Sequence, residues 1–152
     1  MMIHPTGKAV FVEVPKTGST ACTKHLHAHG WFQNGGKGYA TLPNTATGRH
    51  SYPTASTKAF LDEMGATSYG VVRNPFDRMA SLWRASAPGN TSFHAYMISG
   101  KFRHGDMDIL TQPQHTWLDN VDHVMRYEML EEQWDYWADR YGDLPVGPIP
   151  VI

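Results

Sequence analysis

Short runs of apolar and β-branched residues mark the strands that the sequence predicts. Residues 9–14 form the strongest of these runs, and residues 68–72 form a second one. A third run lies near residues 123–127. Apolar runs of about four to eight residues are typical of strands in a sheet. The pattern therefore predicts three strands, of which the first two are buried.

Between and after these strands, apolar residues recur every three or four positions, which is the spacing of one helix face. The predicted helices cover residues 19–29, 54–64, 91–98, 114–118 and 129–141, together with one that begins at Pro75. In that helix, Phe76, Met79, Ala80 and Trp83 share one face, while Arg78 and Ser81 lie on another. Residues 33–48 are rich in Gly, Thr and Asn and are predicted to form a long loop, a feature that is usually functional in a compact domain.

The order of these elements indicates the fold class. Strands that alternate with helices form right-handed βαβ units, and these build a parallel sheet with helices on both faces. We therefore expect an α/β fold with a P-loop-like parallel sheet. The length of 152 residues fits a single domain, 1–152, with its core over about 9–141 and a Pro-rich tail at 142–152. In such sheets, ligands bind beyond the carboxyl ends of the strands.

Composition narrows the class of protein. The chain is 41% apolar and 18% charged, with 5 Trp, 7 Tyr and 6 Phe, which excludes a disordered tail, a collagen-like fibre and a coiled coil. No apolar run reaches the roughly 18 residues of a membrane span, and the N-terminus lacks the form of a signal peptide. Cys22 is the only cysteine, so no internal disulfide forms and a reducing, cytoplasmic location is expected.

The net charge of −1 hides an asymmetry along the chain. Residues 1–105 contain 11 Lys and Arg against 4 Asp and Glu, whereas residues 106–152 contain 2 against 10. A basic first part fits an anionic ligand. Because the Lys and Arg residues are not clustered in runs, the pattern does not favour nucleic acid. No membrane partner is expected, and the oligomeric state is left open.

The loop after the first predicted strand is a candidate anion site. It contains Lys16, Thr17, Gly18, Ser19 and Thr20, and a helix is predicted to begin at Ser19. Backbone N–H groups and the positive end of a helix favour a bound phosphate. Lys16 adds a charge, and the three hydroxyl groups can donate hydrogen bonds. The order of residues differs from a Walker A loop because the Lys precedes the Gly. An ordinary strand-to-helix turn with a capping Ser is the alternative.

A second candidate site follows the second predicted strand. Arg73 ends that strand, and Ser81 lies two helical turns further on. A planar guanidinium and a hydroxyl can hold one phosphate from two sides. The alternative is a surface Arg73 that pairs with Asp77. Together, the two sites would hold two separated phosphates, as in a nucleotide that is phosphorylated at its 3′ and 5′ positions.

These motifs resemble those of the sulfotransferases that use 3′-phosphoadenosine 5′-phosphosulfate (PAPS). The segment Pro15-Lys16-Thr17-Gly18-Ser19-Thr20 resembles their 5′-phosphosulfate loop, and Arg73-x-Pro75-x-x-Arg78-x-x-Ser81 resembles their 3′-phosphate motif. Arg126-Tyr127-Glu128-x-Leu130 is similar to a third, less specific signature. The order and spacing match over about residues 11–141. The chain looks closest to carbohydrate sulfotransferases, especially the heparan sulfate 2-O type.

The resemblance implies that a sulfuryl group moves from PAPS to an acceptor hydroxyl on a small molecule or a saccharide, and that adenosine 3′,5′-bisphosphate is the product. It implies a cradle for the 5′-phosphate and sulfonate at Lys16, Thr17, Gly18, Ser19, Thr20 and Ala21. Arg73 and Ser81 would bind the 3′-phosphate. Lys16 would also be catalytic, by neutralising charge on the leaving phosphate. Arg126 and Glu128 are expected to be structural, and no metal is expected.

Transfer to a hydroxyl needs a proton acceptor, and His suits this role near neutral pH. The chain has nine histidines, and His50 lies 23 residues before Arg73. The resemblance to the 2-O type enzymes implies that His50 is the base; otherwise, it is a loop histidine. Glu13 is the next candidate, although it could instead orient Lys16 or an acceptor.

Two alternatives remain at this stage. A P-loop nucleotide kinase or NTPase would need a Gly-Lys-[Ser/Thr] segment and a Walker B Asp, and the chain has neither. The second alternative is a truncated module that binds the cofactor without turnover. The short segment after the last predicted helix favours this reading, because similar enzymes usually continue beyond that point.

Overall fold

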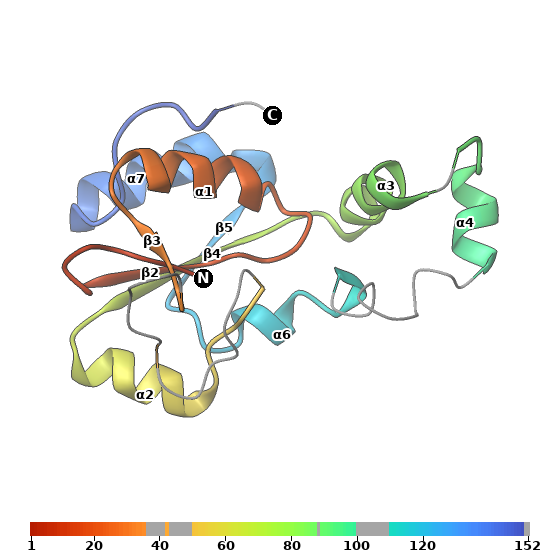
Figure 1. Ribbon diagram of the computed structural model, residues 1–152. Helices are drawn as coiled ribbons and strands as arrows, with labels where there is room; N and C mark the ends of the chain where they lie inside the picture. Colours follow the sequence, from red (N-terminus) through yellow and green to blue (C-terminus); the bar gives the residue numbers. More distant parts are fainter. Residues whose placement is uncertain (36–41, 43–49, 88, 100–109, 151–152) are drawn as a thin grey trace.

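Five strands form one sheet in the computed structural model, which describes residues 1–35, 42, 50–87, 89–99 and 110–150 (Figure 1). The sheet order is β3-β1-β2-β4-β5. The strands are β1 (Met2–Ile3), β2 (Ala9–Val12), β3 (Phe32–Gln33), β4 (Thr67–Val72) and β5 (His123–Arg126). β2, β4 and β5 are the three strands that the apolar runs predict, and they pair in parallel. The α/β fold and its parallel centre are therefore confirmed.

The sheet as a whole is mixed rather than parallel, which corrects the sequence prediction. β1 pairs antiparallel with both β2 and β3. A tight turn joins β1 to β2, where the Gly7 N–H donates to the His4 carbonyl at 2.8 Å and Gly7 has φ +72°. β1 and β3 have two residues each, too short for a period-of-two pattern to reveal them.

Helices cover both faces of the sheet (Figure 1). α1 (Ser19–Ala28) and α7 (Leu130–Tyr141) lie on one face, and α2 (Ala55–Glu63) and α6 (His115–Leu118) lie on the other. α3 (Pro75–Ser86) and α4 (Phe93–Ser99) extend beyond the sheet, and the short 3₁₀ helix η2 (Tyr127–Met129) connects β5 to α7. The six predicted helices are thus present with shifts of one or two residues at their ends. Most of the predicted loop 33–48 lies outside the described residues.

The face of α3 that is buried differs from the expected apolar face. Phe76 is 82% exposed, whereas Arg78 is 5% exposed and Leu82 is 1% exposed. Sequence periodicity predicts that an arginine is exposed, because arginines are rarely buried. The pattern contains no information about the distant backbone carbonyls that can accept hydrogen bonds from a buried guanidinium.

The hydrophobic core extends past residues 9–141 at both ends of the chain. On the side of α1 and α7, buried Met2 and Phe11 pack in one cluster with Trp134, Leu144 and Ile149. The Pro145 carbonyl accepts a hydrogen bond from Trp134 Nε1 at 2.9 Å, and His25 Nε2 lies 3.3 Å from the same oxygen. The Pro-rich segment is therefore fixed against α1 and α7 rather than detached from the core.

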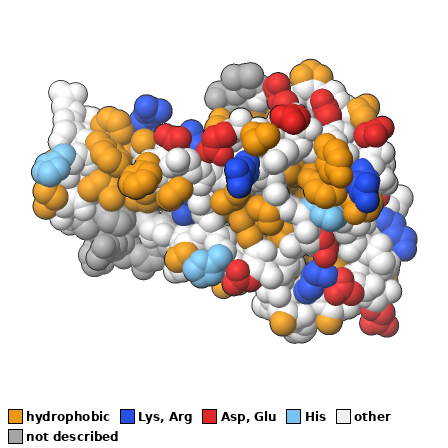
Figure 2. Space-filling view, turned by 180° about the vertical axis from the view of Figure 1, so that it is seen from behind, with side chains coloured by type: hydrophobic (Ala, Val, Ile, Leu, Met, Phe, Trp, Pro, Cys, Tyr) orange, Lys and Arg blue, Asp and Glu red, His pale blue; other side chains and the backbone are white. Residues whose placement is uncertain are grey.

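The surface over α7 combines acidic and aromatic side chains. Figure 2, which views the molecule from behind, shows acidic and hydrophobic side chains gathered on the side where α7 lies. The His123 ring stacks on Trp137 with the ring centroids 4.1 Å apart and on Tyr141 with the centroids 5.0 Å apart. This stack fastens the edge strand β5 to α7. Within the described residues, no helix is both long enough and apolar enough to cross a membrane.

The packing of the Pro-rich segment gives a first prediction. Leu144 is 3% exposed, so Leu144→Ala is expected to lower the free energy of unfolding by about 2–4 kcal/mol through lost burial and a cavity. Val146 lies two residues away but is 73% exposed, so Val146→Ala is expected to change it by less than about 0.5 kcal/mol. Chemical denaturation of both variants measures the difference, and equal small effects would show that this segment does not belong to the core.

Candidate functional site

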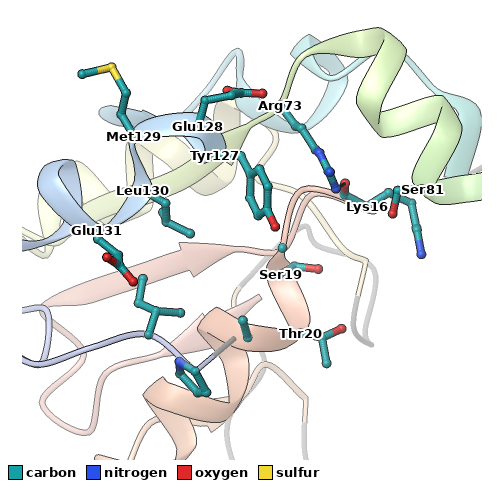
Figure 3. A pocket seen from close by; sticks show the side chains of 14 residues that line it. Lys16, Ser19, Thr20, Arg73, Ser81, Tyr127, Glu128, Met129, Leu130 and Glu131 are labelled. Carbon is teal, nitrogen blue, oxygen red and sulfur yellow. Dashed lines mark hydrogen bonds between the residues drawn. The ribbon is translucent and has the colours of Figure 1, made fainter. Parts of the chain in front are cut away.

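The chain segments after the three parallel strands meet around one pocket. Val12 at the end of β2 pairs with Gly70 of β4, and Val72 at the end of β4 pairs with Arg126 of β5. The carboxyl ends of these strands therefore lie at the same edge of the sheet. The pocket at that edge has a volume of about 630 Å³ (Figure 3). Its polar side is lined by Lys16, Gly18, Ser19, Thr20, Ala21, Arg73 and Ser81.

The loop between β2 and α1 forms one wall of the pocket. Gly18, with φ +81°, is the N-cap residue of α1, and its carbonyl accepts from the Ala21 N–H at 2.9 Å. Lys16 has φ +66°, a left-handed conformation that costs a residue with a Cβ atom about 1–2 kcal/mol. No acidic residue lies in the first turn of α1. The loop thus directs a helix N-terminus and a lysine to the same pocket, an arrangement that favours a bound anion.

Thr17 does not line this pocket, although the sequence assigned its hydroxyl to the ligand. The side chain is fully buried, and its hydroxyl donates a hydrogen bond to the Val14 carbonyl at 2.9 Å. The hydroxyl therefore stabilises the turn of the loop. Ser19 and Thr20, by contrast, do line the pocket (Figure 3).

Arg73 directly follows β4 and is held by its backbone. Its N–H donates to Gln114 Oε1 and its carbonyl accepts from Gln114 Nε2, both at 2.8 Å. Its guanidinium Nη1 donates to the Lys16 carbonyl at 3.4 Å, and its Nε is buried without a partner among the residues that the structure describes. Arg73 does not pair with Asp77, so the simple surface ion pair is not formed. The guanidinium instead faces the loop and keeps a donor for a ligand.

Tyr127 is a pocket residue that sequence reasoning did not select. The Arg73 guanidinium carbon lies 4.3 Å from the centroid of the Tyr127 ring. The ring also lies against Gly18, where an added Cβ would lie 2.5 Å from Tyr127 Cε2. The signal was present in the sequence, because Tyr127 sits inside the Arg126-Tyr127-Glu128 signature. Only the structure shows that its ring connects the segments after β2, β4 and β5.

Glu128 acts as a structural link, as expected. Its carboxylate accepts a hydrogen bond from the Asn74 N–H at 2.8 Å, and this bond lowers the pKa of Glu128 below its usual value. Asn74 in turn caps α3 by accepting from the Phe76 N–H at 2.9 Å. The start of α3 is thereby fixed to the segment after β5, and Ser81 lies further along the same helix.

The other side of the pocket is mainly apolar but also carries two glutamates. It is lined by Tyr127, Glu128, Met129, Leu130, Glu131, Ile149 and Pro150. Figure 3 shows Met129, Leu130 and Glu131 on the opposite side of the opening from Lys16 and Ser81, with Tyr127 between the two sides. The pocket therefore combines a cationic part at the loop and Arg73 with an apolar part that could accept a flat ring.

His50 and Glu13 lie near the loop between β2 and α1 but do not line the pocket. His50 Nδ1 is 3.4 Å from the Glu13 carbonyl, and the His50 carbonyl accepts from Trp117 Nε1 at 3.1 Å. The fully buried Glu13 carboxylate accepts from the Thr23 hydroxyl at 2.7 Å and from Gln33 Nε2 at 3.0 Å. Its Oε2 also lies 3.0 Å from the Met1 amino nitrogen. Glu13 therefore joins β2 to α1 and β3.

Among the described residues, no three His, Cys, Asp or Glu side chains lie close enough together to hold a metal ion.

A family model described as "Sulfotransferase family" matches residues 1–142. No curated protein and no solved structure shows a significant match to the chain.

The contact between Gly18 and Tyr127 gives a second prediction. Gly18→Ala should lower the free energy of unfolding by about 1–3 kcal/mol more than Gly7→Ala, because both residues have positive φ but only Gly18 is packed against a ring. An added Cβ at Gly7 meets nothing within 4 Å, so that variant isolates the backbone cost. Chemical denaturation measures both values.

The double variant Gly18→Ala/Tyr127→Ala checks the cause. It should be less destabilised than the sum of its single variants, because removal of the ring relieves the clash. Equal losses for Gly7→Ala and Gly18→Ala would contradict the tight packing of Tyr127 on the loop.

Proposed function

The chain belongs to the sulfotransferase family, and from this premise we propose that it transfers a sulfuryl group from PAPS to an acceptor hydroxyl on a carbohydrate. The observation that carries the proposal is the presence of two cationic positions in one pocket. One is the loop at Lys16 with the N-terminus of α1, and the other is Arg73 with its buried, unpartnered Nε. The resemblance to the heparan sulfate 2-O type supports the carbohydrate acceptor.

The residues present fit a nucleotide with phosphates at both the 3′ and 5′ positions. The loop from Lys16 to Ala21 binds the 5′-phosphosulfate through its N–H groups, the Ser19 and Thr20 hydroxyls and the lysine. Arg73 and Ser81 bind the 3′-phosphate. The buried Arg73 Nε supports this assignment because a buried donor without an acceptor is costly unless a ligand supplies one.

The apolar part of the pocket suits the nucleoside. Tyr127, Met129, Leu130 and Ile149 offer a flat, apolar surface beside the cationic part. The volume of about 630 Å³ falls within the range of small-molecule sites. In this arrangement the base lies against α7 and the Pro-rich segment, and both phosphates point to the ends of β2 and β4.

The chemistry divides between two side chains. When bound, PAPS supplies a sulfuryl group on a phosphate that can leave. Lys16 places its positive charge where negative charge builds up on that phosphate, a contribution that strengthens toward the transition state. His50 accepts the proton of the acceptor hydroxyl as the new oxygen–sulfur bond forms. Its Nδ1 lies 3.4 Å from the carbonyl of Glu13, three residues before Lys16, so the imidazole lies close to the loop.

Binding of adenosine 3′,5′-bisphosphate tests the nucleotide. We expect the bisphosphate to raise the melting temperature and Arg73→Ala to weaken its binding about 10- to 100-fold, since a hydrogen bond to a charged group contributes about 1.5–3 kcal/mol. Arg126→Ala is the matched control, because Arg126 ends the neighbouring strand but does not line the pocket. Calorimetry with 5′-AMP should give weaker binding that is insensitive to Arg73→Ala. Equal affinity for 5′-AMP, or preferential stabilisation by ATP with magnesium, would contradict the proposal.

Transfer of labelled sulfonate from PAPS to a saccharide tests the two catalytic roles. His50→Ala is expected to lower the rate about 10²- to 10⁴-fold while leaving bisphosphate affinity nearly unchanged. Lys16→Ala is expected to lower both, because its charge acts on the ground state and on the transition state. His27→Ala, an exposed histidine on α1, is the control and should alter neither. A parallel fall in rate, affinity and melting temperature for His50→Ala would instead mean that His50 is structural.

A further inference from the structure

Arg78 is a buried arginine that the proposed function leaves without a role. Only 5% of the residue is exposed, and its three hydrogen bonds all go to backbone carbonyls. Nε donates to Pro15 at 2.9 Å, and the two terminal nitrogens donate to Leu110 at 2.8 Å and to Gln112 at 2.9 Å. No carboxylate of the described residues pairs with it. A buried charge of this kind is costly, so its location calls for a reason.

The three carbonyls belong to segments that shape the cationic part of the pocket. Pro15 directly precedes Lys16 in the phosphate loop. Leu110 and Gln112 lie just before Gln114, whose side chain holds the backbone of Arg73 through two bonds of 2.8 Å. Arg78 itself lies on α3, one turn before Ser81. The Arg78 guanidinium therefore connects three parts of the site. These are the loop, the segment that holds the Arg73 backbone, and the helix that carries Ser81.

The bond to Pro15 explains how Lys16 keeps its unfavourable conformation. In a trans peptide, the C=O and the following N–H lie in one plane and point in opposite directions. Because Arg78 fixes the Pro15 carbonyl, it also fixes the N–H of Lys16 and the plane from which φ of Lys16 is set. Lys16 has φ +66°, and a non-glycine residue keeps such a value only where its surroundings impose it.

We propose that Arg78 is a positioning residue that holds Lys16 and the phosphate loop in the conformation that binds the 5′ end of the donor. This inference rests on the proposed function and extends it to a residue that does not line the pocket. A lysine cannot replace Arg78, because one ammonium group cannot donate in the three fixed directions of a guanidinium.

A double-mutant cycle separates positioning from general stability. In the wild type, Lys16→Ala should weaken binding of adenosine 3′,5′-bisphosphate at least about tenfold. In an Arg78→Met background, the same change should cost less than about threefold, because Lys16 is already displaced. Ser81→Ala should cost the same factor in both backgrounds. If Arg78 only stabilises the fold, the effects of Arg78→Met and Lys16→Ala will be additive, and this result would overturn the proposal.

If Arg78→Met does not fold, the same double-mutant cycle can be measured in an Arg78→Lys background. Arg78→Lys should itself bind adenosine 3′,5′-bisphosphate more weakly than the wild type. Arg84→Met is the matched control, because Arg84 lies on the same helix and is exposed. It should leave affinity and the Lys16 cycle unchanged. Wild-type affinity in Arg78→Lys would overturn the need for the guanidinium geometry.

A second readout does not depend on which nucleotide binds. The Cα chemical shift and the amide–α-proton coupling of Lys16 report its φ angle in solution. Both should move away from left-handed values in Arg78→Met and Arg78→Lys, and stay unchanged in Arg84→Met. If the wild type binds no adenosine bisphosphate, the proposed function fails, but this measurement still tests Arg78. Unchanged Lys16 signals in both Arg78 variants would contradict the inference.

Discussion

The stack of Arg73 on Tyr127 and of Tyr127 on Gly18 is the contact on which the site depends. Each of these residues follows a different parallel strand, so the stack fixes the ends of β4, β5 and β2 relative to one another. Gly18 is required at this point because a side chain would occupy the space of the ring and because its φ is +81°. The arginine that lies on the ring keeps a buried donor, Nε, for a ligand. The same contact thus sets the geometry of the pocket and leaves the Arg73 Nε without a hydrogen-bond acceptor among the described residues.

Charge placement near the loop is consistent with an anion site. Glu13 comes shortly before Lys16 in the sequence, where a carboxylate would oppose an anionic ligand. In the fold, its side chain lies inside the protein and accepts hydrogen bonds from Thr23 and Gln33. Lys16 and Arg73, by contrast, line the pocket, while the buried Arg78 donates a hydrogen bond to the carbonyl of Pro15. The fold thus keeps the Glu13 carboxylate inside the protein, while the two glutamates of the pocket, Glu128 and Glu131, come from the segment after β5.

Local pattern predicted the elements well and the contacts between them less well. A few consecutive residues are enough to predict several elements. These are the strands β2, β4 and β5, the glycine-containing loop and the capped start of α3. Thr17 and Ser19 could not be told apart in this way, because one hydroxyl turns to the Val14 carbonyl and the other to the pocket. Tyr127 and Arg78 were also beyond local pattern, since their partners lie about 109 and 63 residues away in sequence. The two-residue strands β1 and β3 exist only through pairing.

A crystal structure of the protein with adenosine 3′,5′-bisphosphate would show whether one pocket holds both phosphates and the base. The account predicts the 5′-phosphate at the N-terminus of α1, within hydrogen-bond distance of Lys16 and Thr20. It predicts the 3′-phosphate beside Ser81, bonded to the Arg73 Nε, and the base against α7 and the Pro-rich segment. A nucleotide bound outside this pocket, or one in which Arg73 contacts no phosphate, would contradict it.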